Sequence, residues 1–217
     1  MFRVLIADDH PLFRAALRHV VEAMYAEHEI LEASTLDEAQ QAVLGSSDLD
    51  LDLILLDLQM PGSNGFSGLV ALRNTAPSVP IVIVSAADTA EIIRGAITCG
   101  AAGFIPKSYS RDEIGDAMAG VLRGEVYLPR DDLLEPADAP RFGRAGRLRE
   151  HISALTQGEL RVLDLLAKGR SNKIIAYELG IKESTVKAHI TAILRKLRVH
   201  SRTQAVIAAR ELNFSKG

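Results

Sequence analysis

The chain has 217 residues, of which 47% are hydrophobic and none is tryptophan, and its formal net charge is −3. This composition is typical of a globular protein built on aliphatic side chains. No apolar run approaches the roughly 18 residues that a membrane-spanning helix needs, and acidic residues come too early for a signal peptide, so we expect a cytoplasmic protein without a membrane partner. A single cysteine, Cys99, excludes an internal disulfide bond and a multi-cysteine metal site.

Charge is distributed unevenly along the chain. Residues 1–124 hold 8 Lys and Arg against 17 Asp and Glu, a net charge of −9, whereas residues 151–217 hold 12 against 5, a net charge of +7. Residues 125–150, between them, contain three prolines and two glycines with little periodicity, which is typical of a linker. We therefore predict two domains, 1–124 and 151–217, whose opposite charges suit different partners.

In the first domain, short apolar runs alternate with helical patterns. The expected strands are 2–7, 29–33, 51–57, 80–85 and 102–106. The expected helices run from Leu12 to Met24, from a capping box at Thr35 and Glu38, and near 64–76, 88–99 and 110–123. This alternation predicts an α/β fold: a doubly wound (βα)5 domain whose parallel five-stranded sheet is covered on both faces.

Polar residues follow the expected strands where they end. Asp8 and Asp9 end the first strand, Asp57 the third and Ser85 the fourth, and Lys107 follows the fifth. Ligands of an open parallel sheet bind beyond the carboxyl ends of its strands. Three carboxylates gathered there would resist ionisation unless a cation joined them. A hard divalent ion with oxygen ligands, Mg2+ for preference, is therefore the expected cofactor.

The same residues suggest phosphoryl chemistry. Asp57, fixed by a buried strand, can attack phosphorus while the metal neutralises the incoming oxygens. Lys107 and the Ser85 hydroxyl can each hold one phosphoryl oxygen. Singly, each residue has an ordinary structural explanation as a turn former, a helix cap or a surface group. Their joint placement at four strand ends favours a site, and His10 is assigned only turn geometry or a surface position.

The last part of the chain has a helical period throughout. Short helical patterns separated by glycines and capping residues predict a compact all-α bundle of four helices. The expected helices follow a capping box at Thr156 and Glu159 that ends at Gly169, a cap at Ser171 with an end at Gly180, the segment KESTVKAHITAILRKL, and a box at Ser201 and Gln204.

The third of these helices has an apolar stripe on one side and small or basic residues on the other. The stripe comprises Val186, Ile190, Ile193 and Leu197. Such a helix, preceded by a short helix and a Gly turn, suits insertion into the major groove of double-stranded DNA. We expect Lys187 to contact a guanine edge or a phosphate and the Ala188 methyl to contact thymine. Further expected contacts come from Thr191 and Arg195 and, at phosphates, from Asn172, Lys173, Ser184 and Thr185.

The motifs ADDHPLFRAAL, LDLQMPGSNG, VIVSA and AAGFIPKS resemble the receiver domain of bacterial two-component response regulators. The resemblance implies a flavodoxin-like fold with Asp57 as the phosphoacceptor. It also implies that Asp9, Asp57 and the Gln59 backbone carbonyl bind Mg2+ directly, and that Asp8 acts through water. Phe104 stands at the aromatic switch position, which is often Tyr, so that a switch here has to work by burial of the ring. On phosphorylation, Ser85 is expected to move toward the phosphoryl group and Phe104 to turn inward.

The segment LTQGELRVLDLLAKGRSNKIIAYELGIKESTVKAHITAILRKLRVHSRTQAV is similar to the LuxR-type helix-turn-helix. The pairing resembles NarL/FixJ-type response regulators. It implies a phosphorylation-dependent transcription regulator that takes phosphate from a sensor histidine kinase and binds double-stranded DNA as a homodimer when phosphorylated. Thr191 departs from the Lys of some relatives, which leaves base preference open. The helix over 202–212, with Ala205, Val206 and Ala209, is expected either to join two copies or to pack within one.

Two other functions fit parts of the pattern. Asp57 with Mg2+ also suits a phosphatase of the haloacid dehalogenase type, although Gln59 stands where such an enzyme needs a second carboxylate. Alternatively, the receiver could act purely through protein interaction, with a basic bundle that binds protein. Salt dependence would separate this last function from DNA binding, which weakens steeply as salt rises.

Overall fold

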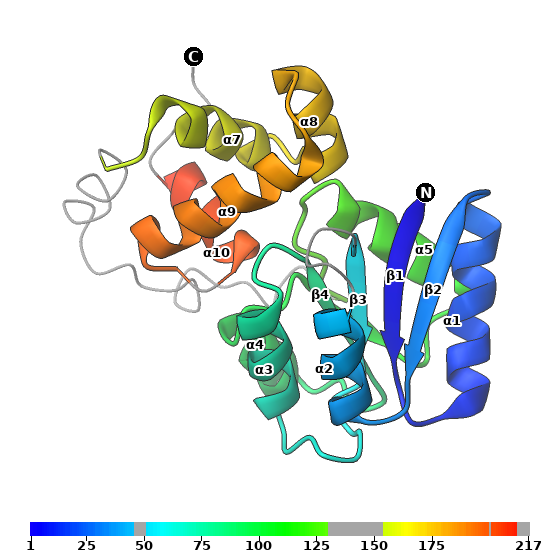
Figure 1. The fold of residues 1–217 in the computed structure, drawn as a ribbon. Coiled ribbons are helices and arrows are strands. Elements are labelled where there is room, and N and C mark those ends of the chain that lie inside the picture. Colours follow the sequence, from blue (N-terminus) through cyan, green and yellow to red (C-terminus); the bar gives the residue numbers. More distant parts are fainter. Residues whose placement is uncertain (46–50, 130–153, 200, 212–217) are drawn as a thin grey trace.

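The computed structural model describes residues 1–45, 51–129, 154–199 and 201–211 (Figure 1). An α/β domain contains the first part of the chain and a helical domain the last part. Within these described residues no helix is both long and apolar enough to cross a membrane.

The first domain is built on a five-stranded parallel sheet. The strand order is β2-β1-β3-β4-β5, so the sheet winds in both directions from β1. The strands are β1 (Phe2–Ala7), β2 (His28–Ala33), β3 (Leu53–Leu56), β4 (Ile81–Ser85) and β5 (Gly103–Pro106). Because β3, β4 and β5 are buried along their whole length, their sequences are nearly continuous apolar runs. The predicted (βα)5 fold is confirmed.

Helices cover both faces of the sheet (Figure 1). They are α1 (Pro11–Met24), α2 (Leu36–Gly45), α3 (Ser67–Thr75), α4 (Ala90–Thr98) and α5 (Arg111–Leu122). Apolar residues of α2, α3 and α4 form one core cluster with the sheet, and those of α1 and α5 form a second cluster on the opposite face. Side chains that alternate along each strand enter the two clusters in turn, which fixes the sheet between two layers.

The start of α2 differs in one detail from the predicted capping box. Thr35 Oγ1 accepts a hydrogen bond from Glu38 N at 3.2 Å, as expected. The Glu38 carboxylate, however, accepts from Ser34 N at 2.7 Å and from the Ser34 hydroxyl at 2.8 Å. The reciprocal half of the box is therefore displaced by one residue, although the helix begins where the sequence predicts.

The second domain is a bundle of short helices. They are α7 (Gln157–Ala167), α8 (Asn172–Leu179), α9 (Glu183–Leu197) and α10 (Arg202–Glu211). The Thr156 side chain and the Glu159 side chain form a reciprocal capping box at the start of α7. Ser171 caps α8, and Gly180, in the left-handed conformation that glycine adopts easily, ends it. The predicted all-α bundle is confirmed.

The chain remains attached to the sheet for a short distance after α5. Tyr127 forms a parallel bridge with Gly103, and its carbonyl accepts a hydrogen bond from Phe104 N at 2.9 Å. Residues 125–129, which the sequence assigns to the linker, therefore lie beside the edge strand β5. The remainder of that linker, 130–150, lies outside the described residues, and the domain boundaries 1–124 and 151–217 stay a prediction.

The helical domain lies at the edge of the sheet where the strands begin, and the carboxyl ends of the strands lie at the opposite edge (Figure 1). Hydrogen bonds between described residues cross from one domain to the other: Lys187 Nζ donates to Leu51 O at 3.3 Å, and Gln204 Nε2 donates to Thr98 O at 3.4 Å. The two domains are thus in direct contact in this structure.

Candidate functional site

An acidic cluster forms where β1 and β3 end. Asp8 and Asp57 are almost fully buried, with 1% and 2% of their surface exposed, and Asp9 is partly exposed. One ligand atom from each of Asp8, Asp9, His10 and Asp57 lies within 4.8 Å of all the others. Neighbouring parallel strands β1 and β3 bring these carboxylates together, since Asp57 N also donates to Ala7 O at 2.8 Å. The structure thus gathers the three acids that the sequence predicted to meet.

Lys107 lies between two of these acids. Its Nζ is 2.7 Å from Asp57 Oδ2 and 2.7 Å from Asp8 Oδ2, and it lies 4.9 Å from the centre of the Phe13 ring. Burial acts to lower the pKa of Lys107, but its hydrogen bonds and charge interactions with Asp57 and Asp8 outweigh this effect and raise the pKa. The lysine is therefore a permanent positive charge within the cluster.

The backbone around the cluster holds the remaining predicted residues close to it. Gln59 N donates to Asp57 Oδ1 at 3.0 Å, which keeps the loop after β3 beside the carboxylate. Ser85 is fully buried, and its hydroxyl accepts from Ala87 N at 3.2 Å. Lys107 N donates to Ser85 O at 2.8 Å and so joins the ends of β4 and β5. These contacts place a hydroxyl and an ammonium at the edge where Asp57 lies.

His10 belongs to the cluster, although sequence reasoning assigned it no chemistry. Its backbone N–H donates to Asp8 Oδ1 at 2.8 Å, which is the expected turn geometry. Its ring Nδ1, however, lies 2.7 Å from Asp9 Oδ1 and 3.3 Å from Asp8 Oδ1. The signal was its position directly after the acidic pair, where a turned backbone returns the ring to the carboxylates.

The donor set fits a hard divalent cation. Asp9 Oδ1 is buried and receives no aligned hydrogen bond from any described residue, while the oxygens of Asp8 and Asp57 lie close by. Carboxylate and carbonyl oxygens are the ligands that Mg2+ prefers. The side chains present are therefore those that a magnesium site requires.

Phe104 lies in the interior of the first domain. Its ring has no exposed surface and belongs to the core cluster on the α2–α4 face of the sheet. The sequence predicted that this ring turns inward during switching. The ring is inside in this structure, and its rotation on phosphorylation stays a prediction.

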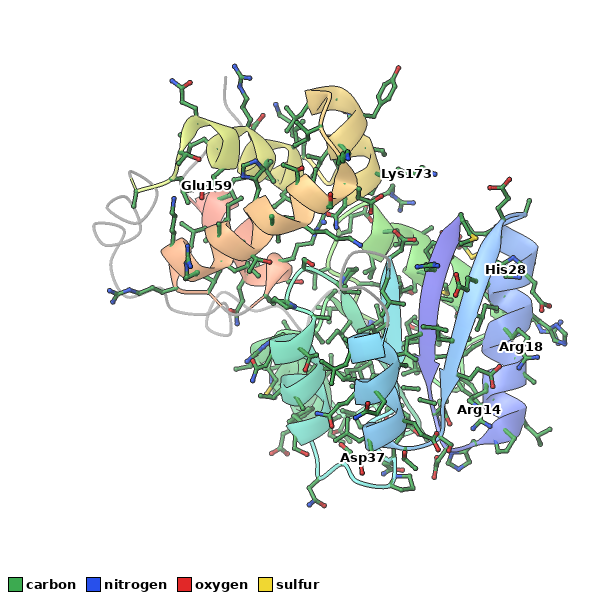
Figure 2. All side chains as sticks on the ribbon, viewed as in Figure 1. Arg14, Arg18, His28, Asp37, Glu159 and Lys173 are labelled. Atoms are coloured by element: carbon green, nitrogen blue, oxygen red, sulfur yellow. The ribbon has the colours of Figure 1, made fainter. Side chains whose placement is uncertain are left out.

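The helix-turn-helix has the geometry that the sequence predicts. The stripe residues of α9 are buried in the core of the bundle, each with at most 1% of its surface exposed: Val186, Ile190, Ile193 and Leu197. Of the predicted DNA-contacting residues, Asn172 and Ser184 are partly exposed, and the following are exposed: Lys173, Thr185, Ala188, Thr191 and Arg195. Figure 2 shows Lys173 extending from α8.

Lys187 is the exception among the predicted DNA contacts. The sequence places it on the outer face of α9, but only 3% of its surface is exposed because the first domain covers it. Its Nζ donates to Leu51 O and lies 3.9 Å from Glu183 Oε1. Lys187 is thus outward with respect to its own domain and yet buried in the whole chain, whereas Ala188 and Thr191 of the same helix remain exposed.

Helix α10 packs in two directions. The core of the helical domain buries Ala205, Val206 and Ala209. Of the two predicted roles, joining two copies or packing within one, these three residues have the second. Ser201 Oγ accepts from Gln204 N at 3.2 Å, which is half of the predicted capping box. The Gln204 side chain instead donates to Thr98 O of the receiver.

An acidic cluster with a lysine at the carboxyl edge of a parallel sheet, joined to a helix-turn-helix, defines a protein that links phosphoryl chemistry to DNA. Comparison with known families agrees with this class. Residues 4–119 match the response regulator receiver domain, and residues 153–209 match the bacterial regulatory proteins of the luxR family.

Similar proteins cover nearly the whole chain. A glycerol metabolism activator from Pseudomonas putida is 48% identical and covers 99% of this chain and 98% of its own length. The nitrate/nitrite response regulator protein NarP from Escherichia coli K12 is 37% identical, and the match covers 95% of this chain and 93% of NarP. A crystal structure of a LuxR family DNA-binding response regulator from Silicibacter pomeroyi gives a TM-score of 0.52 at 37% identity, covering 60% of this chain and 98% of that one.

The chain therefore belongs to the response regulators that join a receiver to a LuxR-type DNA-binding domain, and it is a phosphorylation-dependent regulator of transcription. The haloacid dehalogenase alternative is not the family that matches.

Proposed function

We propose that this protein acts in the cytoplasm, that Asp57 accepts a phosphoryl group from a sensor histidine kinase, and that this event uncovers α9 for DNA binding as a homodimer. The observation that supports the proposal is where two lysines lie. Lys107 lies on the acidic cluster, and Lys187 of the DNA-binding helix is buried against the same domain. The receiver thus contains both the modified residue, Asp57, and the surface around Leu51 that covers Lys187.

The chemistry at Asp57 needs little from the protein beyond position and charge. A carboxylate oxygen of Asp57 forms a bond to phosphorus as the phosphorus–nitrogen bond of a phosphohistidine breaks and the imidazole leaves. Asp9, Asp57 and the Gln59 carbonyl would hold Mg2+, with Asp8 acting through water, and the ion supplies neutralisation of phosphoryl charge. Lys107 and the Ser85 hydroxyl bind the phosphoryl oxygens that arrive between them.

Elements of the receiver connect Asp57 and Ser85 to the residues that contact the helical domain. Leu51, whose carbonyl accepts from Lys187, precedes β3, and Asp57 follows the other end of that strand. Likewise Thr98, which accepts from Gln204, ends α4, the helix that follows β4 and Ser85. A shift of β3 that accompanies phosphorylation would therefore act on the hydrogen bond between Lys187 and Leu51, and a shift of α4 on the hydrogen bond between Gln204 and Thr98.

Release of the helical domain would present a complete DNA-binding surface. Lys187 and Ala188 would then contact base edges in the major groove, with Thr191 and Arg195 beside them. The phosphate contacts are proposed for Asn172, Lys173, Ser184 and Thr185. Two copies would meet half-sites about one helical turn apart.

The direct test treats the protein with acetyl phosphate and Mg2+ and locates the label by mass spectrometry. We expect label on Asp57, loss of label in Asp57→Asn, and full label in the matched control Asp112→Asn, whose carboxylate lies exposed at the start of α5. Undiminished labelling of Asp57→Asn would overturn the assignment.

The DNA half of the proposal is tested with sites selected from genomic DNA by the phosphorylated protein. Lys187→Ala should weaken binding by about 1–3 kcal/mol and relax sequence preference, because a base contact is lost. Unchanged affinity and unchanged preference in the folded variant would reject α9 as the reading helix.

A further inference from the structure

A cavity of about 400 Å³ lies between the two domains. Its receiver wall includes the apolar side chains of Phe2 and Leu122, at the edge of the sheet opposite the acidic cluster. Its helical-domain wall is polar and includes Asn172, Lys173 and Arg202. The cavity therefore has an apolar side and a basic side, and each side belongs to a different domain.

Arg202 is a buried cation at this cavity. Only 9% of its surface is exposed, and two of its nitrogens donate to Asn172 Oδ1 and to Arg170 O. Its Nε is buried and has no acceptor among the described residues, and none of the described carboxylates forms an ion pair with it. Burial alone lowers the pKa of Arg202 to about 10, so the guanidinium remains charged at neutral pH.

A buried charge without a counter-charge is costly, and the surroundings of Arg202 add to the positive potential. The first turn of α8, Asn172–Leu179, begins beside it, so the positive end of the helix dipole lies at the same wall. Lys173 adds a second full charge, and Figure 2 shows it on the receiver side of α8.

Two carboxylates also line the cavity, on the receiver wall, but both have partners of their own. Asp52 Oδ2 accepts from Arg3 N at 2.9 Å, and Glu27 Oε2 lies 3.8 Å from the amino terminus of Met1. Neither forms an ion pair with Arg202. Arg202 thus has no ion pair with any carboxylate of the described residues, and the facing receiver wall combines these two carboxylates with apolar side chains.

We propose that this cavity binds a small organic anion, with its carboxylate, sulfonate or phosphate group at Arg202, Lys173 and the start of α8 and its apolar body against Phe2 and Leu122. Because the two walls come from different domains, such a ligand binds the closed arrangement and stabilises it. The site would add a second input, chemical rather than phosphoryl, to the uncovering of α9. The existence of the site is independent of the phosphoacceptor proposal, and only its effect on uncovering rests on it.

The test uses anilinonaphthalene sulfonate, an aromatic anion that fluoresces in apolar surroundings, and its neutral analogue phenylnaphthylamine, on the full chain. We expect one sulfonate probe bound per chain and at least tenfold weaker binding of the neutral analogue. Lys173→Ala should weaken sulfonate binding about fivefold through the loss of one exposed charge. The control Lys182→Ala, an exposed lysine at the start of α9, should leave binding unchanged.

A second variant blocks the cavity from the receiver side without touching the helical domain. Ala26 is exposed and lines the cavity, so Ala26→Phe should fill part of the space and abolish probe binding. Arg202 is left intact because it also holds the turn before α8. Equal binding of the two probes, or binding that survives both Lys173→Ala and Ala26→Phe, would overturn the proposal.

Beryllofluoride with Mg2+, which mimics the phosphoryl group, tests whether the site spans both domains. It should release the sulfonate probe from the wild-type chain and leave it bound to Asp57→Asn. Amine-reactive labelling of Lys187 shows whether the domains of the treated wild-type chain have separated. If they have separated and the probe stays bound, the site lies in one domain and the proposal is overturned. Failure of Asp57 to accept phosphate would instead contradict the phosphoacceptor assignment alone and leave the probe results on the untreated chain unchanged.

Discussion

Lys107 determines much of the electrostatics at the candidate phosphoacceptor site. Its ammonium lies 2.7 Å from both Asp8 and Asp57, which are buried acids that would otherwise repel each other. A divalent cation bound by the same acids would compete with this lysine for their charge, since both act as positive neighbours of the same oxygens. The lysine therefore offsets the repulsion between the two carboxylates and at the same time limits how strongly they bind metal.

Lys107→Met is accordingly expected to raise the affinity of the protein for Mg2+ by several-fold, corresponding to about 1 kcal/mol of lost repulsion at an intermediate dielectric. The measurement is the increase in melting temperature with added Mg2+, which should be larger in the variant than in the wild type. The control Lys168→Met removes an exposed lysine that pairs with Asp164 on α7. An equal Mg2+ response in Lys107→Met and wild type would contradict this account of the site.

At the level of single elements, the start of α7 shows how local sequence signals and distant contacts combine. Glu159 accepts from Thr156 N at 2.6 Å within the capping box and also from Lys196 Nζ of α9 at 2.7 Å. Burial of Glu159 acts to raise its pKa, but the hydrogen bonds from Lys196 and Thr156 outweigh this effect and lower the pKa below its ordinary value of 4.5. The carboxylate thus joins α7 to α9.

This shift has a defined consequence for stability. A carboxyl group whose pKa is lowered on folding contributes stability above its unfolded value, near 4.5 here, and loses that contribution as the pH falls through the folded value. Glu159→Gln should therefore cost about 1–3 kcal/mol at neutral pH and flatten the acid dependence of unfolding by urea. Glu178→Gln, which removes a half-exposed partner of Arg170, is the matched control and should change little. A Glu159→Gln chain with wild-type stability at neutral pH would show that the pair is not stabilising.

Most elements of the fold could be predicted from the sequence because their signals are local. Capping boxes, glycine ends and apolar runs depend on residues a few positions apart, and α7 begins at the box formed by Thr156 and Glu159. The acidic cluster was also predictable, since the carboxyl ends of parallel strands share one edge. By contrast, the contacts of Lys187 with Leu51 and of Gln204 with Thr98 join residues more than 100 positions apart, and no periodicity encodes them.

In the whole molecule, the two domains carry net charges of opposite sign and meet through a polar contact at the amino edge of the sheet. Inter-domain surfaces within one chain resemble transient protein–protein interfaces, so the two domains can separate without unfolding either part. The closed arrangement therefore needs only a modest change in free energy to open, which is the range that a phosphoryl group can supply.

Gln204→Ala tests this balance from the helical side. Removal of its hydrogen bond to Thr98 should weaken closure by about 1 kcal/mol and raise the DNA affinity of the untreated chain by several-fold. The affinity of the beryllofluoride-treated chain should be unchanged, because that form is already open. The measurement is fluorescence anisotropy on a selected DNA site, with Gln157→Ala, an exposed glutamine of α7, as the control. A Gln204→Ala chain that binds DNA no better than wild type before treatment would argue against this contact as part of the cover.

The most direct test of the central claim, that phosphorylation of the receiver uncovers α9, is the rate at which an amine-reactive reagent labels Lys187, followed by peptide mass spectrometry. Lys182, exposed at the start of the same helix, serves as the internal standard. The account predicts slow labelling of Lys187 in the untreated chain, a rate near that of Lys182 after beryllofluoride and Mg2+, and continued protection in Asp57→Asn. Labelling of Lys187 at the rate of Lys182 before treatment, or protection that treatment leaves unchanged, would contradict it.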